Sequence, residues 1–202
     1  MRAGAESGER QRRLFDVLVA TLGLLVLSPL LAVIGLLVKL ESPGPVLFRQ
    51  KRVGKDGRPF EMLKFRSMRV AAPDEDRVAD VAEIESFRFR PVGQKTAIGR
   101  ALRACSLDEL PNLLNVLRGD MHIVGPRPEE PAIVARYRPE YHRRHEVKPG
   151  ITGLAQVNGR ADLTYSEIMA YDLDYVDRHP FRRDIQIMLR TLGVVIRREG
   201  AR

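Results

Sequence analysis

An apolar stretch near the N-terminus, residues 17–38, limits which folds this chain can adopt more than any other feature. It is interrupted by Thr21 and by the pair Ser28-Pro29. At a rise of about 1.5 Å per residue, a helix of this length spans the hydrocarbon core of a bilayer. A buried helix of a soluble core is disfavoured because the stretch is apolar on all sides, and a signal peptide is disfavoured because no small-residue cleavage site follows. The sequence therefore predicts a membrane helix.

The charges and the proline of this stretch bear on whether the helix crosses the membrane. Basic residues precede it (Arg12, Arg13) and follow it (Lys39), so the positive-inside rule favours no crossing direction. Pro29 removes a backbone hydrogen bond and bends a helix, while the Ser28 hydroxyl can satisfy the freed carbonyl. Two arrangements remain: a bent helix that enters and leaves on one face of the membrane, and a kinked helix that spans it.

The charge balance narrows the classes of partner. The 34 Lys and Arg residues exceed the 26 Asp and Glu residues, which gives a net charge of +8. This balance suits anionic lipid or substrates that carry phosphate. Nucleic acid is disfavoured because the basic residues are not clustered with aromatic residues and no nucleic-acid-binding motif is present. The single Cys105 excludes an internal disulfide, and 202 residues suffice for one domain with a membrane element.

A central stretch, residues 103–128, combines carboxylates and arginines around a short helix. Its sequence is RACSLDELPNLLNVLRGDMHIVGPRP, with Asp108 and Glu109 adjacent and Gly119 closing the apolar helical run. One interpretation is that Ser106 and Glu109 form a capping box at the start of a helix. The other is that the carboxylates and nearby arginines hold a divalent metal ion and a diphosphate. The residue types alone leave both interpretations open.

The segment SLDELPNLLNVLRGDMHIVGPRP resembles the central motif of bacterial sugar transferases known as small monotopic phosphoglycosyl transferases. The resemblance covers nearly the whole chain in the same order, through RLFD, FRQKRVG, KFRSM, KPGITGLAQVNGR and YDLDYV. It implies transfer of a sugar-1-phosphate from a UDP-sugar to a membrane polyprenyl phosphate, with release of UMP. It also implies a covalent phosphosugar–aspartate intermediate and a role as the first membrane step of bacterial glycoconjugate synthesis.

The resemblance also implies roles for individual residues. Asp108 would be the catalytic nucleophile, and Glu109 would bind Mg²⁺ beside it, with Asp108 as the second metal ligand. The implied substrate-binding residues are Lys64, Arg103, Arg127 and Pro128. Because arginines surround Asp108 in the sequence, we expect them to favour its ionised form. Asn158, Gly159 and Arg160 are weaker candidates for the lining of the site.

The expected fold is α+β, mainly helical with a small sheet. Residues 1–12 would form a mobile N-terminus, residues 13–40 a re-entrant membrane helix broken at Ser28-Pro29, and residues 41–202 a cytoplasmic catalytic domain. The resemblance implies a monotopic protein on the cytoplasmic face of the bacterial inner membrane, with membrane lipid as a partner and no nucleic acid. The sequence indicates no oligomeric state.

Two further segments carry structural predictions. Residues 46–53 and 60–68 read as the strands of a hairpin around a glycine-containing turn. Residues 184–198 read as an amphipathic helix, which either packs on the core or lies in the headgroup layer of the membrane. The alternative to an enzyme is a basic, non-catalytic adaptor that attaches to anionic lipid.

Overall fold

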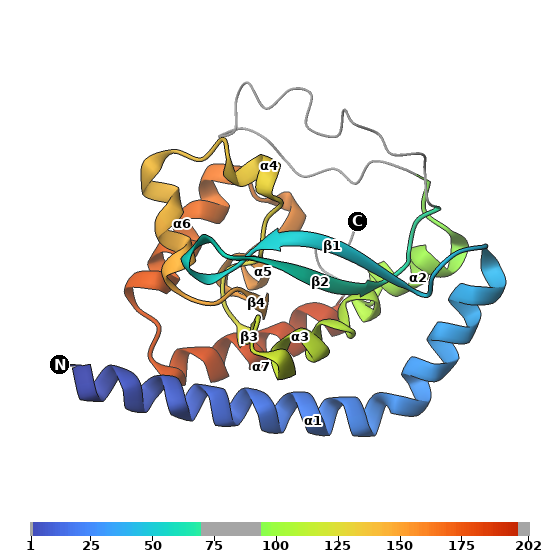
Figure 1. The fold of residues 1–202 in the computed structure, drawn as a ribbon, viewed down its shortest axis with the longest axis horizontal. Helices are drawn as coiled ribbons and strands as arrows, with labels where there is room; N and C mark the ends of the chain where they lie inside the picture. The colour runs from blue at the N-terminus through green and yellow to red at the C-terminus, as the bar shows by residue number, and fades with distance from the viewer. Residues whose placement is uncertain (1, 70–93, 198–202) are drawn as a thin grey trace.

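The computed structural model describes residues 2–69 and 94–197, and within them the fold is mainly helical with two small sheets (Figure 1). This agrees with the predicted fold class. The α-helices are α1 (Arg2–Glu41), α2 (Ala97–Ala104), α3 (Asn112–Arg118), α4 (Pro131–Val134), α5 (Leu154–Val157), α6 (Tyr165–Asp177) and α7 (Phe181–Arg197). The strands are β1 (Leu47–Val53), β2 (Pro59–Phe65), β3 (His122–Val124) and β4 (Gly150–Thr152). The 3₁₀ helices are η1 (Lys55–Gly57), η2 (Leu107–Glu109), η3 (Pro139–Glu146) and η4 (Arg160–Asp162).

Strands β1 and β2 form the predicted hairpin. They pair antiparallel, with Leu47 opposite Phe65 and Val53 opposite Pro59. The connection η1 contains Asp56 and Gly57, both with positive φ, as a tight hairpin turn requires. The hairpin therefore ends within three residues of the range expected from the sequence.

Strands β3 and β4 form a short parallel pair that the sequence did not predict. His122 lies opposite Gly150, and Val124 lies opposite Thr152. The following turn packs backbone against backbone, since a Cβ on Gly125 would lie 2.5 Å from the Lys148 carbonyl oxygen. Only glycine allows this approach. The two motifs GPRP and KPGITG, distant in sequence, are thereby joined.

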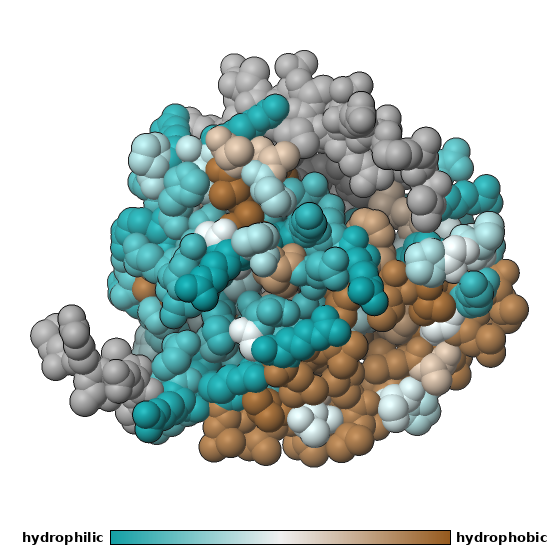
Figure 2. Space-filling model, in the orientation of Figure 1, coloured by the Kyte–Doolittle hydropathy of each residue, from teal (hydrophilic) through white to brown (hydrophobic). Residues whose placement is uncertain are grey.

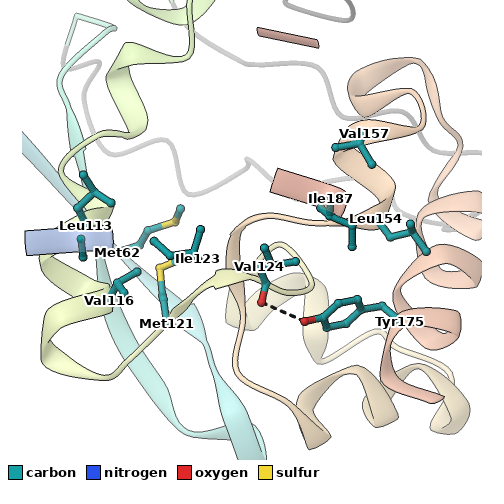
Figure 3. Close-up of a cluster of buried hydrophobic side chains, with 11 residues drawn as sticks. Met62, Leu113, Val116, Met121, Ile123, Val124, Leu154, Val157, Tyr175 and Ile187 are labelled. Carbon is teal, nitrogen blue, oxygen red and sulfur yellow. Dashed lines mark hydrogen bonds between the residues drawn. The ribbon is translucent and has the colours of Figure 1, made fainter. Parts of the chain in front are cut away.

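A hydrophobic cluster holds these elements together (Figure 3). Side chains from β2, α3, β3, α5, α6 and α7 converge in it: Met62, Leu113, Val116, Ile123, Leu154, Val157, Tyr175 and Ile187. The Tyr175 hydroxyl lies 3.2 Å from the Val124 carbonyl and 2.7 Å from the Asp184 carboxylate, so the one polar atom of this ring has acceptors for its proton. Burial of this apolar surface is what fixes α3 against the hairpin.

One polar side chain completes the joint between α3 and β2. Asn115, which is 0% exposed, accepts a hydrogen bond from the Leu63 backbone N–H at 3.1 Å. Its amide donates to the Glu61 carbonyl at 2.6 Å and to Asp120 at 3.2 Å. The side chain thus pairs with the free edge of β2 as a neighbouring strand would.

Helix α1 is bent, as its proline predicts. Figure 1 shows it running along the lower edge of the molecule and then turning sharply in its C-terminal part. Pro29 lies inside the helix, and the Ser28 hydroxyl donates to the Leu25 carbonyl at 2.8 Å. That carbonyl is the one that would accept from residue 29 in an unbroken helix, so the expected compensation by Ser28 is confirmed.

The start of α1 differs from the expected boundary at residue 13. The helix begins at Arg2, and Arg12 is 7% exposed. The Arg12 guanidinium donates to the Asp184 carboxylate at 2.6 Å and to the His179 carbonyl at 2.6 Å. Residues before 13 therefore continue the helix, and its N-terminal half is tied to the start of α7.

Much of the apolar surface of α1 is exposed. Figure 2 shows apolar residues gathered along the lower and right-hand edges, where Figure 1 places α1. The exposed large apolar side chains of this helix are Leu14, Leu18, Leu22, Leu25, Val26, Leu30, Val33, Leu36, Leu37 and Leu40. By length and composition, the part Gly8–Glu41 is long and apolar enough to cross a membrane. The helix is therefore a candidate membrane segment, as the sequence predicted.

Candidate active site

The two central carboxylates lie on η2, between α2 and α3. Ser106, just before η2, has a left-handed backbone with φ of 56°, and its side chain caps no helix. Its hydroxyl instead accepts a hydrogen bond from Arg160 at 3.2 Å. The capping-box interpretation is therefore wrong. Asp108 is 7% exposed, and Glu109 faces cations from two other elements.

Glu109 is the centre of a charged cluster. Arg127 donates to both of its carboxylate oxygens, at 2.5 and 3.1 Å, in a bidentate pair. The Lys64 ammonium donates to the Glu109 carboxylate from β2 at 3.3 Å. The structure thus brings together Lys64, Asp108, Glu109 and Arg127, which the sequence motifs placed in one site.

The charges of this cluster shift the pKa of each member. Although burial opposes ionisation, the charges of Arg127 and Lys64 hold the pKa of Glu109 well below its usual value. Burial lowers the pKa of Lys64 to about 8, against the attraction of Glu109. The Glu109 carboxylate raises the pKa of Arg127 above its already high value. At neutral pH the cluster therefore holds a carboxylate between two cations.

The surroundings of Asp108 shift its pKa in both directions. Burial and then the adjacent Glu109 charge raise the pKa of Asp108, and they outweigh Lys64, Arg103 and Arg127. The arginines act in the expected direction, but the sequence could not reveal the burial. A raised pKa also makes a carboxylate a candidate for chemistry rather than for a surface ion pair.

The other expected residues lie around this cluster. Arg103 is near enough for its charge to lower the pKa of Asp108, and its Nη1 lies 3.9 Å from the Met68 sulfur. Pro128 is buried, and its carbonyl accepts from Arg52 at 3.2 Å. Arg160 reaches Ser106 beside the carboxylates, whereas Asn158 accepts from Arg190 on α7 at 2.8 Å, away from them.

The residues present fit a hard divalent cation only in part. Among residues 2–69 and 94–197, no group of three His, Cys, Asp or Glu could hold a metal ion. Asp108 and Glu109 are adjacent carboxylates of the type that Mg²⁺ prefers, and Mg²⁺ often takes one or two carboxylates and completes its shell with water and substrate phosphates. These two residues therefore suit a metal ion that arrives with a diphosphate.

Sequence reasoning missed two arginines next to the site, Arg144, which is buried, and Arg52, which is partly buried. Arg144 donates to the Arg127 carbonyl at 2.7 Å, and Arg52 donates to the Pro128 carbonyl. Arg52 lies in the motif FRQKRVG and Asp172, the partner of Arg144, in YDLDYV. These motifs indicated that the two segments are important, but they did not indicate which residues the segments contact.

Comparison with known proteins identifies the class. A sequence profile of the family described as bacterial sugar transferase matches residues 8–198. The UDP-glucose:undecaprenyl-phosphate glucose-1-phosphate transferase of Caulobacter vibrioides is 45% identical over 95% of this chain and 72% of its own length. The Escherichia coli protein of the same name is 46% identical over 90% of this chain and 39% of its own length. The undecaprenyl-phosphate galactose phosphotransferase of Salmonella typhimurium is 37% identical, and this chain spans 41% of it.

Carboxylates set against cations, an apolar helix long enough to cross a membrane, and these matches together define a transferase of phosphate-containing groups. The chain belongs to the bacterial sugar transferase family, as its motifs predicted, and its relatives are phosphoglycosyl transferases. The family match favours an enzyme over the non-catalytic adaptor. Since the chain spans only about two fifths of the Escherichia coli and Salmonella relatives, it corresponds to a part of those longer proteins.

Proposed function

We propose that this protein transfers a sugar-1-phosphate from a UDP-sugar to undecaprenyl phosphate, giving undecaprenyl diphosphate sugar and UMP. The observation that carries the proposal is the cluster of Asp108, Glu109, Lys64 and Arg127 beside a helix with an exposed apolar surface. Two cations and two carboxylates suit a diphosphate donor, and the apolar helix suits an acceptor confined to the bilayer. The names of the relatives support both substrates.

The reaction proceeds in two displacements at one phosphorus atom. In the first, a carboxylate oxygen of Asp108 attacks the phosphorus that bears the sugar, and the bond from that phosphorus to the bridging oxygen breaks. UMP leaves with that oxygen and its electron pair, and an acyl phosphate remains on Asp108. In the second, an oxygen of the lipid phosphate attacks the same phosphorus, and the Asp108 carboxylate is released. A covalent intermediate means that the two anionic substrates need not occupy the site together.

The remaining residues stabilise charge. Arg127 and Lys64 face the diphosphate and offset the negative charge that develops on the departing UMP. Asp108 and Glu109 would hold Mg²⁺, which supplies further neutralisation of the diphosphate when bound. Arg103 and Pro128 line the donor side of the cluster. Glu109, when paired with its two cations, keeps them oriented before the donor arrives.

The two ends of α1 support a re-entrant, monotopic arrangement on the cytoplasmic face. Arg12 near one end pairs with Asp184, while Ile34 and Val38 near the other end pack with Phe65 in the globular part. A straight helix from Arg12 to Val38 would be about 39 Å long, enough to cross the bilayer. Both ends contact the same globular body, and a bent helix achieves this without crossing. The exposed Leu189 and Leu192 of α7 suit a place in the headgroup layer.

The test is release of UMP by the purified full chain in detergent or nanodiscs. We expect continued release from UDP-glucose or UDP-galactose beyond the first turnover to depend on added undecaprenyl phosphate. With donor alone, intact mass should show an adduct of one sugar plus one phosphate. Asp108→Asn should lose both turnover and adduct, because an amide is a poor nucleophile.

A matched control separates the nucleophile from a general charge effect. Asp56→Asn changes an exposed carboxylate on the hairpin turn, where asparagine tolerates the positive φ, and should leave turnover unchanged. Near-normal UMP release by Asp108→Asn would exclude Asp108 as the nucleophile. Absence of release from every UDP-sugar tested with wild type would contradict the proposed reaction.

A further inference from the structure

Three successive carbonyls of the turn that carries Arg127 are each held by a donor. The Pro126 carbonyl accepts from the Gly150 backbone N–H at 2.9 Å. The Arg127 carbonyl accepts from Arg144 at 2.7 Å, and the Pro128 carbonyl accepts from Arg52 at 3.2 Å. The flanking prolines fix φ at positions 126 and 128, but they leave the ψ angle of Arg127 within a broad extended range. The hydrogen bond from Arg144 narrows that remaining angle.

The two terminal nitrogens of the Arg144 guanidinium are held by three partners, the Arg127 carbonyl among them. Arg144 is 2% exposed, and its guanidinium pairs with Asp172 at 2.5 Å and donates to the Tyr137 hydroxyl. Both side chains of the Arg144–Asp172 pair are 1% exposed. The guanidinium therefore has little freedom to move away from the Arg127 carbonyl.

Stability alone is a weak reason for such an arrangement. Removing a guanidinium and a carboxylate from water costs several kcal/mol for each ion, and well-packed apolar residues often serve a fold as well as a buried pair. A second, partly buried arginine, Arg52, donates to the next carbonyl of the turn and approaches Glu129 at 3.6 Å. Two arginines that both end on carbonyls of one turn indicate that the geometry of that turn is what they maintain.

We propose that Arg144 is a positioning residue for the transfer reaction, which fixes the backbone at Arg127 so that the Arg127 guanidinium meets Glu109 and the donor diphosphate. This inference rests on the proposed function for the role of Arg127 itself. Arg144 touches neither substrate nor Asp108. It acts through Arg127, with Asp172 holding it and Arg52 securing the next carbonyl.

The test is a double-mutant cycle between Arg144 and Arg127. The double replacement Arg144→Met with Asp172→Leu removes the ion pair as a unit, so that no unpaired charge stays buried. We expect it to lower kcat/KM for the UDP-sugar by roughly 10- to 100-fold, since a displacement of about 1 Å can cost this much. In an Arg127→Ala background the same replacement should lower kcat/KM by less than about threefold, because the effects of residues that act as one unit are not additive.

A second variant and a matched control keep the cycle decisive. Arg144→Lys retains the charge but cannot reach all three partners. It should therefore fold even if the double replacement does not, and it should lower kcat/KM more with Arg127 present than in Arg127→Ala. Arg12→Met with Asp184→Leu removes another buried pair whose arginine also donates to a backbone carbonyl. It should lower the melting temperature about as much as the replacement of Arg144 and Asp172 does. Its effect on kcat/KM should be equal with Arg127 present and in Arg127→Ala.

The outcomes are separable. Equal losses from the Arg144 variants with and without Arg127, no loss at all, or wild-type kcat/KM in Arg127→Ala would each overturn the inference. The same cycle is measured in parallel on the Kd of UDP, with the same non-additivity expected. If wild type binds UDP but releases no UMP from any donor, the proposed reaction fails while the cycle on UDP binding still decides the role of Arg144.

Discussion

At the scale of single residues, burial and neighbouring charges set the pKa values of four ionisable groups in the site: Lys64, Asp108, Glu109 and Arg127. Glu109 keeps its charge because two cations face it, whereas Asp108 has its pKa raised by burial and by that same Glu109 charge. Lys64 has its pKa lowered to about 8 because it is buried. Environments that push the pKa values of adjacent carboxylates apart are typical of sites that assign them different roles.

These shifts give a pH profile with two limbs. Asp108 must be ionised to attack, so the rate should rise with pH through its raised pKa. Above about pH 8, Lys64 loses its charge and the rate should fall. First-turnover UMP release without acceptor is the measurement, since ionisation of the lipid phosphate then plays no part.

Two lysine-to-arginine variants test this profile, one in the site and one at an exposed position. Lys64→Arg should move the falling limb to higher pH, because a guanidinium stays charged. Lys51→Arg, an exposed change on β1, should leave it in place. A falling limb that is unchanged in Lys64→Arg would exclude Lys64 as its cause.

The metal expectation also belongs to the residue scale. Excess EDTA should abolish UMP release and added Mg²⁺ should restore it. Glu109→Gln should raise the Mg²⁺ concentration needed for half-maximal rate, because an amide is a weaker ligand for a hard cation than a carboxylate. Direct Mn²⁺ binding, followed by electron paramagnetic resonance, should weaken in the same variant. Full turnover in excess EDTA would rule the metal out.

At the scale of elements, the sequence predicted segments better than the contacts between them. The hairpin, the glycine end of α3 at Gly119 and the bend at Pro29 each follow from one local residue type, and each is present. Helix α7 begins three residues before its expected start at 184, because Pro180 sets the boundary. Local chemistry was sufficient for these features.

What the sequence could not give are contacts between distant residues. Arg144 lies 17 residues from Arg127 and 28 from Asp172, inside a segment with many charges, so nothing marked it out. The burial that raises the pKa of Asp108 could not be predicted for the same reason, because burial is a property of the folded chain. The parallel pairing of β3 with β4 likewise joins segments that no local pattern links.

The joint between α3 and β2 allows a prediction at this scale. Asn115→Ala should lower the free energy of unfolding by about 2–4 kcal/mol, since the Leu63 N–H and the Glu61 carbonyl lose a buried partner. Thermal unfolding in detergent measures it. Asn158→Ala, which removes a partly exposed hydrogen bond to the Leu154 carbonyl, should cost less than about 1 kcal/mol. Similar melting temperatures for the two variants would mean that this joint does not stabilise the fold.

At the scale of the whole molecule, the proposed membrane arrangement depends on the position of α1. Its N-terminal half lies along the globular part through Arg12, Asp16 and Ala20, which are all buried. Its C-terminal end is held by Arg66, which donates to the carbonyls of Val38 and Ser42. The exposed apolar surface between these anchors then faces one side of the molecule (Figure 2).

This arrangement predicts that both ends of α1 stay on the cytoplasmic side. With Cys105→Ser as background, Ala5→Cys places one thiol near the N-terminal end of α1, and Asp56→Cys places one beyond its C-terminal end. In intact cells both should resist a membrane-impermeant thiol reagent, and both should label after lysis. Labelling of the Ala5→Cys protein alone in intact cells would mean that the helix crosses.

The bend is the element to change, because it keeps the two anchors of α1 on one body. Replacing Pro29 by Leu and Ser28 by Ala restores the hydrogen bond to the Leu25 carbonyl and leaves an apolar run long enough to span the bilayer. Part of the Ala5→Cys population should then become accessible in intact cells, and turnover should fall by the same fraction, since a crossing helix pulls the Arg12–Asp184 contact apart. Ser28→Ala alone keeps Pro29, so its effects on labelling and on turnover should both be smaller than those of the double variant. A straightened helix with unchanged labelling and full turnover would show that the bend does not set the topology.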